Sequence, residues 1–366
     1  MSARYLPEPP HKHGQAAALG ILLINLGTPD EPTPKAVRRY LKQFLWDPRV
    51  VEIPRAVWWL ILNGIILNTR PKASAQKYAK VWSSEGSPLR VHTEKQAKLL
   101  QGYFVQAGYR NVQVDYAMRY GQPDVASALG RLKAAGCTRI LALPMYPQYA
   151  ASTTASAVDA LGAAFARLRN QPELRVVRNF HDDPAYIRAL AHSVQTHWNQ
   201  NGRGELLVMS FHGLPRFSLD KGDPYFCECH KTARLLAEAL NLKPEQYQVT
   251  FQSRFGRTEW LKPYTQPTLE ALAKKGSKHI DIICPGFVAD CLETLEEIAI
   301  ECRAAFLANG GQALNYIPCL NEQHDFISAL LTLAQRHMQD WLASPAPDAA
   351  TLAQQAERAH SLGAKA

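Results

Sequence analysis

One histidine follows an apolar run, at a place where a ligand-binding side chain is expected. Residues 206–209 are apolar over the length of a buried strand, and His212 and Gly213 come shortly after them. In an open α/β sheet, ligands bind beyond the carboxyl ends of the strands. An imidazole in that position can take up or release a proton near neutral pH. The alternative is a loop histidine that only satisfies local hydrogen bonds.

Three glutamates further along the chain have the spacing of one helix face. Glu293, Glu297 and Glu301 are four residues apart, and Asp290 precedes them by about one turn. Their oxygens suit a divalent cation that is held loosely and passed on. The alternative is a solvated acidic face near a helix start, where the helix dipole favours negative charge. The local sequence leaves both interpretations open.

The composition is that of a folded protein with a basic surface. The chain has 366 residues, of which 46% are hydrophobic and 20% charged, and its net charge is +9. This length suits two domains, and the basic excess suits nucleic acid, anionic lipid or an acidic small substrate. No dense Lys/Arg block with interleaved aromatic residues occurs, so we expect no nucleic-acid partner. Seven cysteines and an N-terminal stretch without the apolar core of a signal peptide predict reduced thiols and a cytoplasmic location.

Short apolar runs that end in marked loops predict strands in both halves of the chain. We expect strands at residues 20–26, 112–118, 139–145 and 174–179, and again at 206–209, 248–252, 279–284 and 314–317. The predicted fold class is therefore α/β with two similar lobes, and a small-molecule site is expected in the cleft between them. The predicted domains are a flexible lead (1–17), a first lobe (18–188), a second lobe (189–343) and a tail (344–366).

Residues 56–67 form the most apolar segment, and a basic segment follows them. The apolar segment is shorter than the roughly 20 residues that a bilayer span needs, and Asn63 and Gly64 interrupt it. It is either a core helix or an apolar lip that receives a flat aromatic ligand and touches a membrane surface. The basic segment, with Arg70, Lys77 and Lys80, is either a solvated face or a set of partners for the carboxylates of a ligand.

Four longer motifs occur together in this chain. They are S-F-H-G-L-P followed by G-D-P-Y around His212, L-G-T-P after the first strand, Y-P-Q-Y-A-A-S-T-T from Tyr146, and F-V-A-D-C-L-E-T-L-E-E-I from Phe287. Together they resemble the signatures of ferrochelatases, the enzymes that insert ferrous iron into a porphyrin. They span residues 22 to about 320, which is nearly the whole globular part.

The resemblance implies a fold, a reaction and a set of site residues. It implies two Rossmann-like lobes of the chelatase type, each a four-stranded parallel sheet flanked by helices. It also implies a lyase that inserts Fe²⁺ into protoporphyrin IX to give protoheme, the last step of heme biosynthesis. His212 and Glu293 would be catalytic and face each other across the ring, and both would handle metal together with Glu297 and Glu301. The implied porphyrin-binding residues are Leu26, Arg70, Tyr78, Ser87, Arg119, Tyr120 and Tyr149.

The same resemblance guides the expected cofactors and partners. Some ferrochelatases carry a [2Fe-2S] cluster, and Cys227, Cys229 and His230 are spaced like metal ligands, but the other cysteines are scattered and we expect no cluster and no required cofactor. Leu26 stands where some relatives have Tyr or Met, and leucine cannot ligate a metal. The expected partners are protoporphyrin IX and ferrous iron, the expected state is a monomer, and a peripheral contact with the inner membrane is left open.

Two alternative functions are kept. The first is a chelatase for another tetrapyrrole or metal, such as coproporphyrin or cobalt. The second is a non-catalytic carrier of heme or metal that is built on two α/β lobes.

Overall fold

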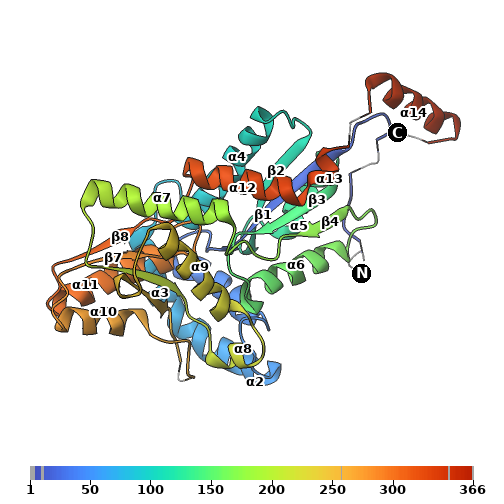
Figure 1. Cartoon of the computed structure of the whole chain (residues 1–366). Coiled ribbons are helices and arrows are strands. Elements are labelled where there is room, and N and C mark those ends of the chain that lie inside the picture. Colours follow the sequence, from blue (N-terminus) through green and yellow to red (C-terminus); the bar gives the residue numbers. More distant parts are fainter. Residues whose placement is uncertain (1–4, 10–11, 257, 345–346, 365–366) are drawn as a thin grey trace.

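Two parallel sheets, each flanked by helices, form the core of the molecule (Figure 1). The computed structural model describes residues 5–9, 12–256, 258–344 and 347–364. The predicted lead and tail lie partly outside these ranges. Within these ranges no helix combines the length and the apolar character that a membrane span needs.

The first sheet contains four parallel strands in the order β2-β1-β3-β4. The central strand β1 is buried along almost its whole length, as expected for an unbroken apolar run covered on both faces. The strands are β1 (Ala18–Gly27), β2 (Val112–Tyr120), β3 (Cys137–Pro144) and β4 (Glu173–Val176). The helical elements of this half are α1 (Pro34–Trp46), α2 (Arg55–Ile61), η1 (Leu62–Ile66), α3 (Leu67–Val81), α4 (Pro88–Gln106), α5 (Val125–Ala134), η2 (Ala151–Ala155) and α6 (Ser156–Phe165).

The second sheet repeats this plan in the order β6-β5-β7-β8. The predicted pair of four-stranded parallel lobes is therefore confirmed. The strands are β5 (Leu206–His212), β6 (Tyr247–Gln252), β7 (His279–Ile283) and β8 (Ala313–Ile317). The helical elements are α7 (Pro184–Asn201), α8 (Arg216–Asp220), α9 (Tyr225–Ala239), η3 (Pro244–Gln246), α10 (Thr265–Lys274), η4 (Glu293–Cys302), α11 (Arg303–Ala308), α12 (His324–His337), α13 (Gln339–Leu342) and α14 (Ala349–Ser361).

Two local features differ from the sequence-based expectation. Strand β5 continues past the apolar run and includes His212, because pairing with β6 extends to Gln252. The acidic segment is a π-helix, η4, and a second π-helical turn, η1, carries Asn63 and Gly64 without a break between α2 and α3. π-Helical turns are rare and are frequent at functional sites.

A common core joins the two lobes and fixes the space between them. One cluster of buried apolar side chains contains Leu141 and Leu143 of β3 together with Met209 and Phe211 of β5. Helix α12 packs against both α4 and α7, which lie beside it in Figure 1. The predicted boundary at residues 188 and 189 falls within α7. The lobes are thus held in one arrangement rather than joined by a loose linker.

Candidate active site

A cavity lies between the lobes, at the carboxyl ends of both sheets. Its space is about 1060 Å³ including the open mouth, and most of its lining is apolar. The first lobe contributes Leu26, Met145 and Tyr146, and the second contributes Tyr225, Trp260 and Phe287. Apolar, aromatic-lined clefts are typical of sites for small organic ligands.

His212 lines this cavity, and one of its two ring nitrogens forms a hydrogen bond within the protein. Its Nδ1–H donates to the Gly213 carbonyl oxygen at 2.6 Å. A carbonyl can only accept, so the proton of the neutral ring must be on Nδ1. The Nε2 lone pair is then available to take a proton or to bind a metal ion.

Glu293 is the first residue of η4 and lines the same cavity. Its backbone carbonyl accepts a hydrogen bond from Gln252 Nε2 at 2.8 Å, which ties the start of η4 to the end of β6. The Cys291 thiol is beside it, and burial, followed by the charge of Glu293, raises the pKa of this thiol well above its ordinary value. In the absence of a metal ion, burial therefore favours the protonated form of this thiol.

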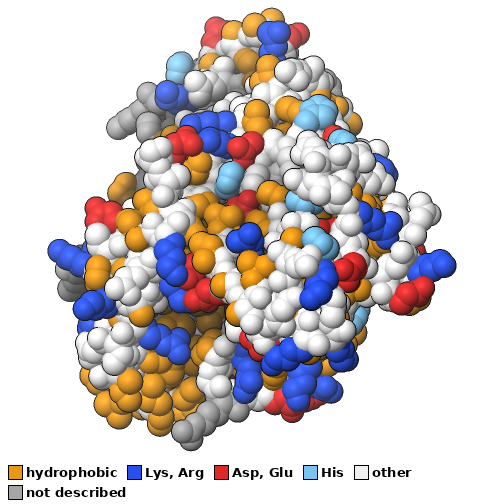
Figure 2. Space-filling view, turned by 90° about the vertical axis from the view of Figure 1, so that its left-hand side faces the viewer, with side chains coloured by type: hydrophobic (Ala, Val, Ile, Leu, Met, Phe, Trp, Pro, Cys, Tyr) orange, Lys and Arg blue, Asp and Glu red, His pale blue; other side chains and the backbone are white. Residues whose placement is uncertain are grey.

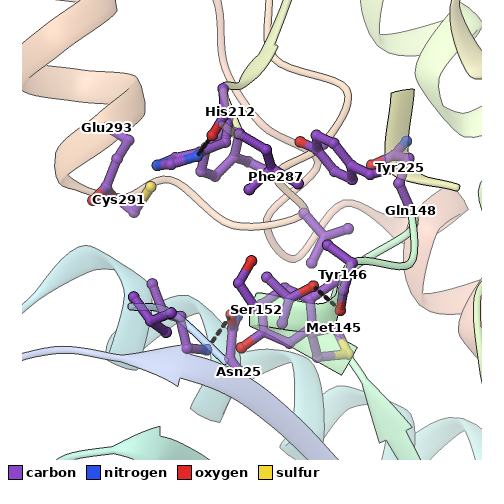
Figure 3. A pocket seen from close by; sticks show the side chains of 18 of the residues that line it. Asn25, Met145, Tyr146, Gln148, Ser152, His212, Tyr225, Phe287, Cys291 and Glu293 are labelled. Carbon is purple, nitrogen blue, oxygen red and sulfur yellow. Dashed lines mark hydrogen bonds between the residues drawn. The ribbon is translucent and has the colours of Figure 1, made fainter. Parts of the chain in front are cut away.

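The structure brings His212 and Glu293 together, but on one wall. Figure 3 shows both side chains on the second-lobe side of the cavity, with Asn25, Met145 and Ser152 on the opposite side. The expectation that they face each other across the ligand is not met, because both follow strands of the same sheet. A flat ligand would thus meet the imidazole and the carboxylate from one face.

Glu297 is four residues after Glu293 in η4 and is not part of the cavity lining. It accepts hydrogen bonds from the Ser253 N–H at 2.7 Å and from Ser253 Oγ at 2.5 Å. Burial raises the pKa of Glu297, although these hydrogen bonds and the neighbouring His212 act in the opposite direction. The carboxylate also stabilises Ser253, whose φ of 65° is unfavourable for a residue with a side chain.

Glu301 is nearer the surface and is already paired. Its carboxylate accepts a hydrogen bond from Lys77 Nζ at 2.8 Å. The described residues contain no group of three or more His, Cys, Asp or Glu side chains arranged as a metal site. The predicted metal residues His212, Glu293, Glu297 and Glu301 therefore form a series of positions, not one coordination sphere.

Of the porphyrin-binding residues predicted in and before the basic segment, some lie at the cavity and others do not. Leu26 lines the cavity and packs against the cluster that contains Ala289 and Cys291. The Arg70 guanidinium lies 5.4 Å from the ring centre of Phe255, which also lines the cavity, so Arg70 is near its edge. Tyr78 is buried, and Ser87 is buried and accepts a hydrogen bond from the Thr28 hydroxyl at 2.8 Å. Neither Tyr78 nor Ser87 belongs to the cavity lining, so their contact with porphyrin stays a prediction.

Arg119 and Tyr120 both point to Asp47 instead of the cavity. Arg119 Nη2 donates to Asp47 at 2.5 Å and the Tyr120 hydroxyl donates to it at 2.8 Å. Burial would raise the pKa of Asp47, but hydrogen bonds from Ser156 and Tyr120 and the charge of Arg119 hold it below the ordinary value. The charge of Arg119 is thus already matched within the protein. Its predicted role toward a porphyrin remains a prediction.

Tyr149 lies in a groove beside the cavity, on a loop that two carboxylates hold against the second lobe. Its N–H donates to the buried Glu228 at 2.7 Å, and the Ala151 N–H donates to Asp223 at 2.7 Å. The other oxygen of Asp223 accepts from the N–H of Tyr225 at 3.0 Å. Asp223 therefore connects the two walls of the cavity and helps to set their separation.

Sequence reasoning missed the aromatic side chains that form much of the wall. Tyr225, Phe287 and Trp260 all line the cavity. Tyr225 belongs to the G-D-P-Y motif and Phe287 follows Pro285 and Gly286 at the end of β7, so both were within motifs already recognised. Their signal was an aromatic residue within a recognised motif.

The fold places the chain in the class of two-lobed α/β proteins in which each lobe is a four-stranded parallel sheet flanked by helices. Among solved structures, the sirohydrochlorin chelatase SirB from Bacillus subtilis in complex with cobalt has a TM-score of 0.52 at 11% identity, covering 90% of this chain and 100% of that chain. A multi-domain protein of Deinococcus radiodurans has a TM-score of 0.53 at 11% identity, covering 94% of this chain and 59% of that one. At such identities, these structures show the fold alone.

Sequence similarity identifies the family within that class. The ferrochelatase family model matches residues 18–338. A ferrochelatase of Aromatoleum aromaticum is 64% identical over 363 residues, covering 99% of this chain and 100% of that protein, and one of Chromobacterium violaceum is 58% identical, covering 99% of both. The chain belongs to the ferrochelatase family.

Proposed function

We propose that this chain is a lyase that inserts Fe²⁺ into protoporphyrin IX in the cavity between the lobes, which yields protoheme in the last step of heme biosynthesis. The observation that carries the proposal is the meeting of His212 and Glu293 in one mostly apolar cavity between the lobes. A stable heme carrier would need a permanent iron ligand. An imidazole beside a carboxylate suits transfer of a proton and a metal ion better.

The reaction exchanges one metal ion for two protons. A free-base porphyrin carries protons on two of its four inner nitrogens, and Fe²⁺ cannot enter a flat ring while those protons remain. Contacts of the ring periphery with Tyr225, Trp260 and Phe287 would hold it in a distorted shape and offset the strain. His212 Nε2 accepts one pyrrole proton, and Glu293, once it has helped to hold the arriving metal ion, accepts the other.

The remaining residues of the wall support delivery from one face. Glu297 and Glu301 follow Glu293 along η4 and lead from the cavity toward the surface. Leu26, which also lines the cavity, offers no metal ligand. We propose that the protein acts as a monomer.

An assay of metal insertion tests the proposed reaction. The purified protein should insert Fe²⁺ into protoporphyrin IX under anaerobic conditions, with a lower rate for coproporphyrin, because the mostly apolar lining favours the less charged ring. The measurement is the change in the visible spectrum from free base to metalloporphyrin. Tight heme retention without insertion would support the carrier alternative, and faster insertion into coproporphyrin would change the substrate.

The apolar lip suggests a peripheral contact with the cytoplasmic face of the inner membrane. Val57, Trp59, Leu60 and Ile65 of α2 and η1 are 51–63% exposed. Figure 2 shows apolar side chains gathered at the lower end of the molecule, the end at which Figure 1 places α2. An exposed apolar patch of this kind marks an interaction surface, and protoporphyrin itself partitions into membranes.

Sedimentation with lipid vesicles tests the lip. The double change Trp59→Ser and Leu60→Ser should reduce co-sedimentation with vesicles that contain anionic lipid. Leu99→Ser, at an exposed leucine of α4, is the matched control and should leave it unchanged. Equal binding of all three proteins would exclude the lip as the membrane contact.

A further inference from the structure

Two lysines of α3 reach from the first lobe to the acidic π-helix of the second. Lys77 Nζ donates to Glu301 at 2.8 Å and to Glu296 at 3.0 Å, and Lys80 Nζ donates to the other oxygen of Glu296 at 2.9 Å. Glu296 is 1% exposed, so its charge needs these partners. The outer end of the acidic series is thus occupied by an ammonium group that the protein itself supplies.

Only some of the carboxylates of η4 have a cationic partner. The helix carries four carboxylates, and Lys77 and Lys80 match two of them. Within the described residues, Glu293 and Glu297 form no ion pair with a lysine or arginine. When both are ionised, the charge left over equals that of one divalent cation.

Resting on the proposed function, we propose that Lys77 is an exchangeable counter-ion at the entrance for the metal. An arriving divalent cation displaces the Lys77 ammonium from Glu301 and then moves along Glu297 and Glu293 to the cavity. No bond other than the ion pair and the coordination bonds changes in this step.

Three features favour the release of the Lys77 ammonium group from Glu301. The Lys77 and Glu301 side chains are 41% and 42% exposed, and ion pairs at such exposure are weak. Lysine offers a compact charge on a flexible stem, unlike the fixed fork of arginine. Glu296 keeps Lys80 when Lys77 swings away, so no buried carboxylate is left without a partner.

The exchange also favours divalent over monovalent cations. A monovalent ion that replaces an ammonium group gains little, because the charge at Glu301 is the same before and after. A divalent ion adds one positive charge beside carboxylates that have no cationic partner of their own. Lys77 therefore sets both the affinity and the charge selectivity of the outer position.

Variants that change the charge of α3 test the proposal. The quantity to measure is the apparent KM for Fe²⁺ of each variant, divided by its KM for porphyrin. Lys77→Gln frees Glu301 and should lower the metal KM by roughly two- to fivefold, the size of effect expected for an exposed pair. Lys80→Gln should raise it, because Lys77 then becomes the sole partner of the buried Glu296 and is held more tightly. Lys77→Arg should also raise it, since a guanidinium is harder to displace.

Lys72→Gln is the matched control, because Lys72 is an exposed residue of the same helix and its loss changes the net charge equally. Its metal KM should equal that of the wild type. Calorimetric titration with Zn²⁺ in the absence of porphyrin should reproduce the order of affinities, with Lys77→Gln tightest. Equal metal KM values for Lys77→Gln and Lys72→Gln would overturn the exchange. A wild type that inserts no iron would instead refute the proposed function.

Discussion

Iron insertion by the His212→Ala variant is expected to fall by about 10²- to 10⁴-fold, the usual contribution of a positioned acid–base group. The reason is geometric: the Nδ1–H is held by the Gly213 carbonyl, which leaves Nε2 in the cavity as the proton acceptor. Alanine removes that acceptor and leaves the apolar walls in place. The measurement is kcat for insertion of Fe²⁺ into protoporphyrin IX, together with porphyrin affinity from fluorescence quenching.

His279→Ala is the control for His212→Ala. His279 is exposed at the opposite end of the same sheet, at the start of β7, and should tolerate alanine with unchanged kcat. Porphyrin affinity of the His212→Ala variant should stay within a few-fold of the wild type. Full insertion activity in a folded His212→Ala protein would remove the imidazole from the mechanism.

Glu293→Gln is expected to lower kcat by about 10²-fold, because an amide of equal size neither accepts a proton nor carries the charge that attracts the metal ion. The backbone contact of Glu293 with Gln252 does not involve the side chain, so the start of η4 should keep its place. Rates measured over a range of Fe²⁺ concentrations separate a loss in kcat from a loss in metal affinity.

Glu238→Gln provides the comparison for the Glu293 variant. Glu238 is exposed on α9 and pairs only with the exposed Arg234 among the described ion pairs, so its loss should have little effect. Near-normal turnover of Glu293→Gln with normal iron affinity would show that the carboxylate has no part in the site.

The positions of the strands were accessible from the sequence because apolar runs bounded by Gly and Pro mark buried parallel strands. The extension of β5 to His212 was not, because Ser210 breaks the apolar run, and its burial depends on hydrogen bonds to Gln252 and Thr265 that the sequence does not show. The π-helical form of η4 likewise has no simple periodicity signal. The π-helical form of η4 determines which of its carboxylates face the cavity and which face α3.

That His212 and Glu293 line one cavity was predictable, because each lies in a recognised motif near the carboxyl end of a strand. The partners of charged groups were not, since a sequence does not show which charges a fold brings together. Arg119 was expected at the ligand, yet Asp47 binds it. Glu296 was not predicted as a site residue, because it does not fit the four-residue spacing of Glu293, Glu297 and Glu301. In the structure it is the most buried acid of η4 and the ion-pair partner of both Lys77 and Lys80.

A double-mutant cycle of His212 and Glu293 tests most directly whether the two side chains act on one bound porphyrin. The quantity to measure is kcat for iron insertion by His212→Ala, by Glu293→Gln and by the double variant. Residues that act as a unit are strongly non-additive, so the double variant should be about as slow as the slower single variant. Losses that multiply in the double variant would mean that the two groups work independently, and would contradict a shared site.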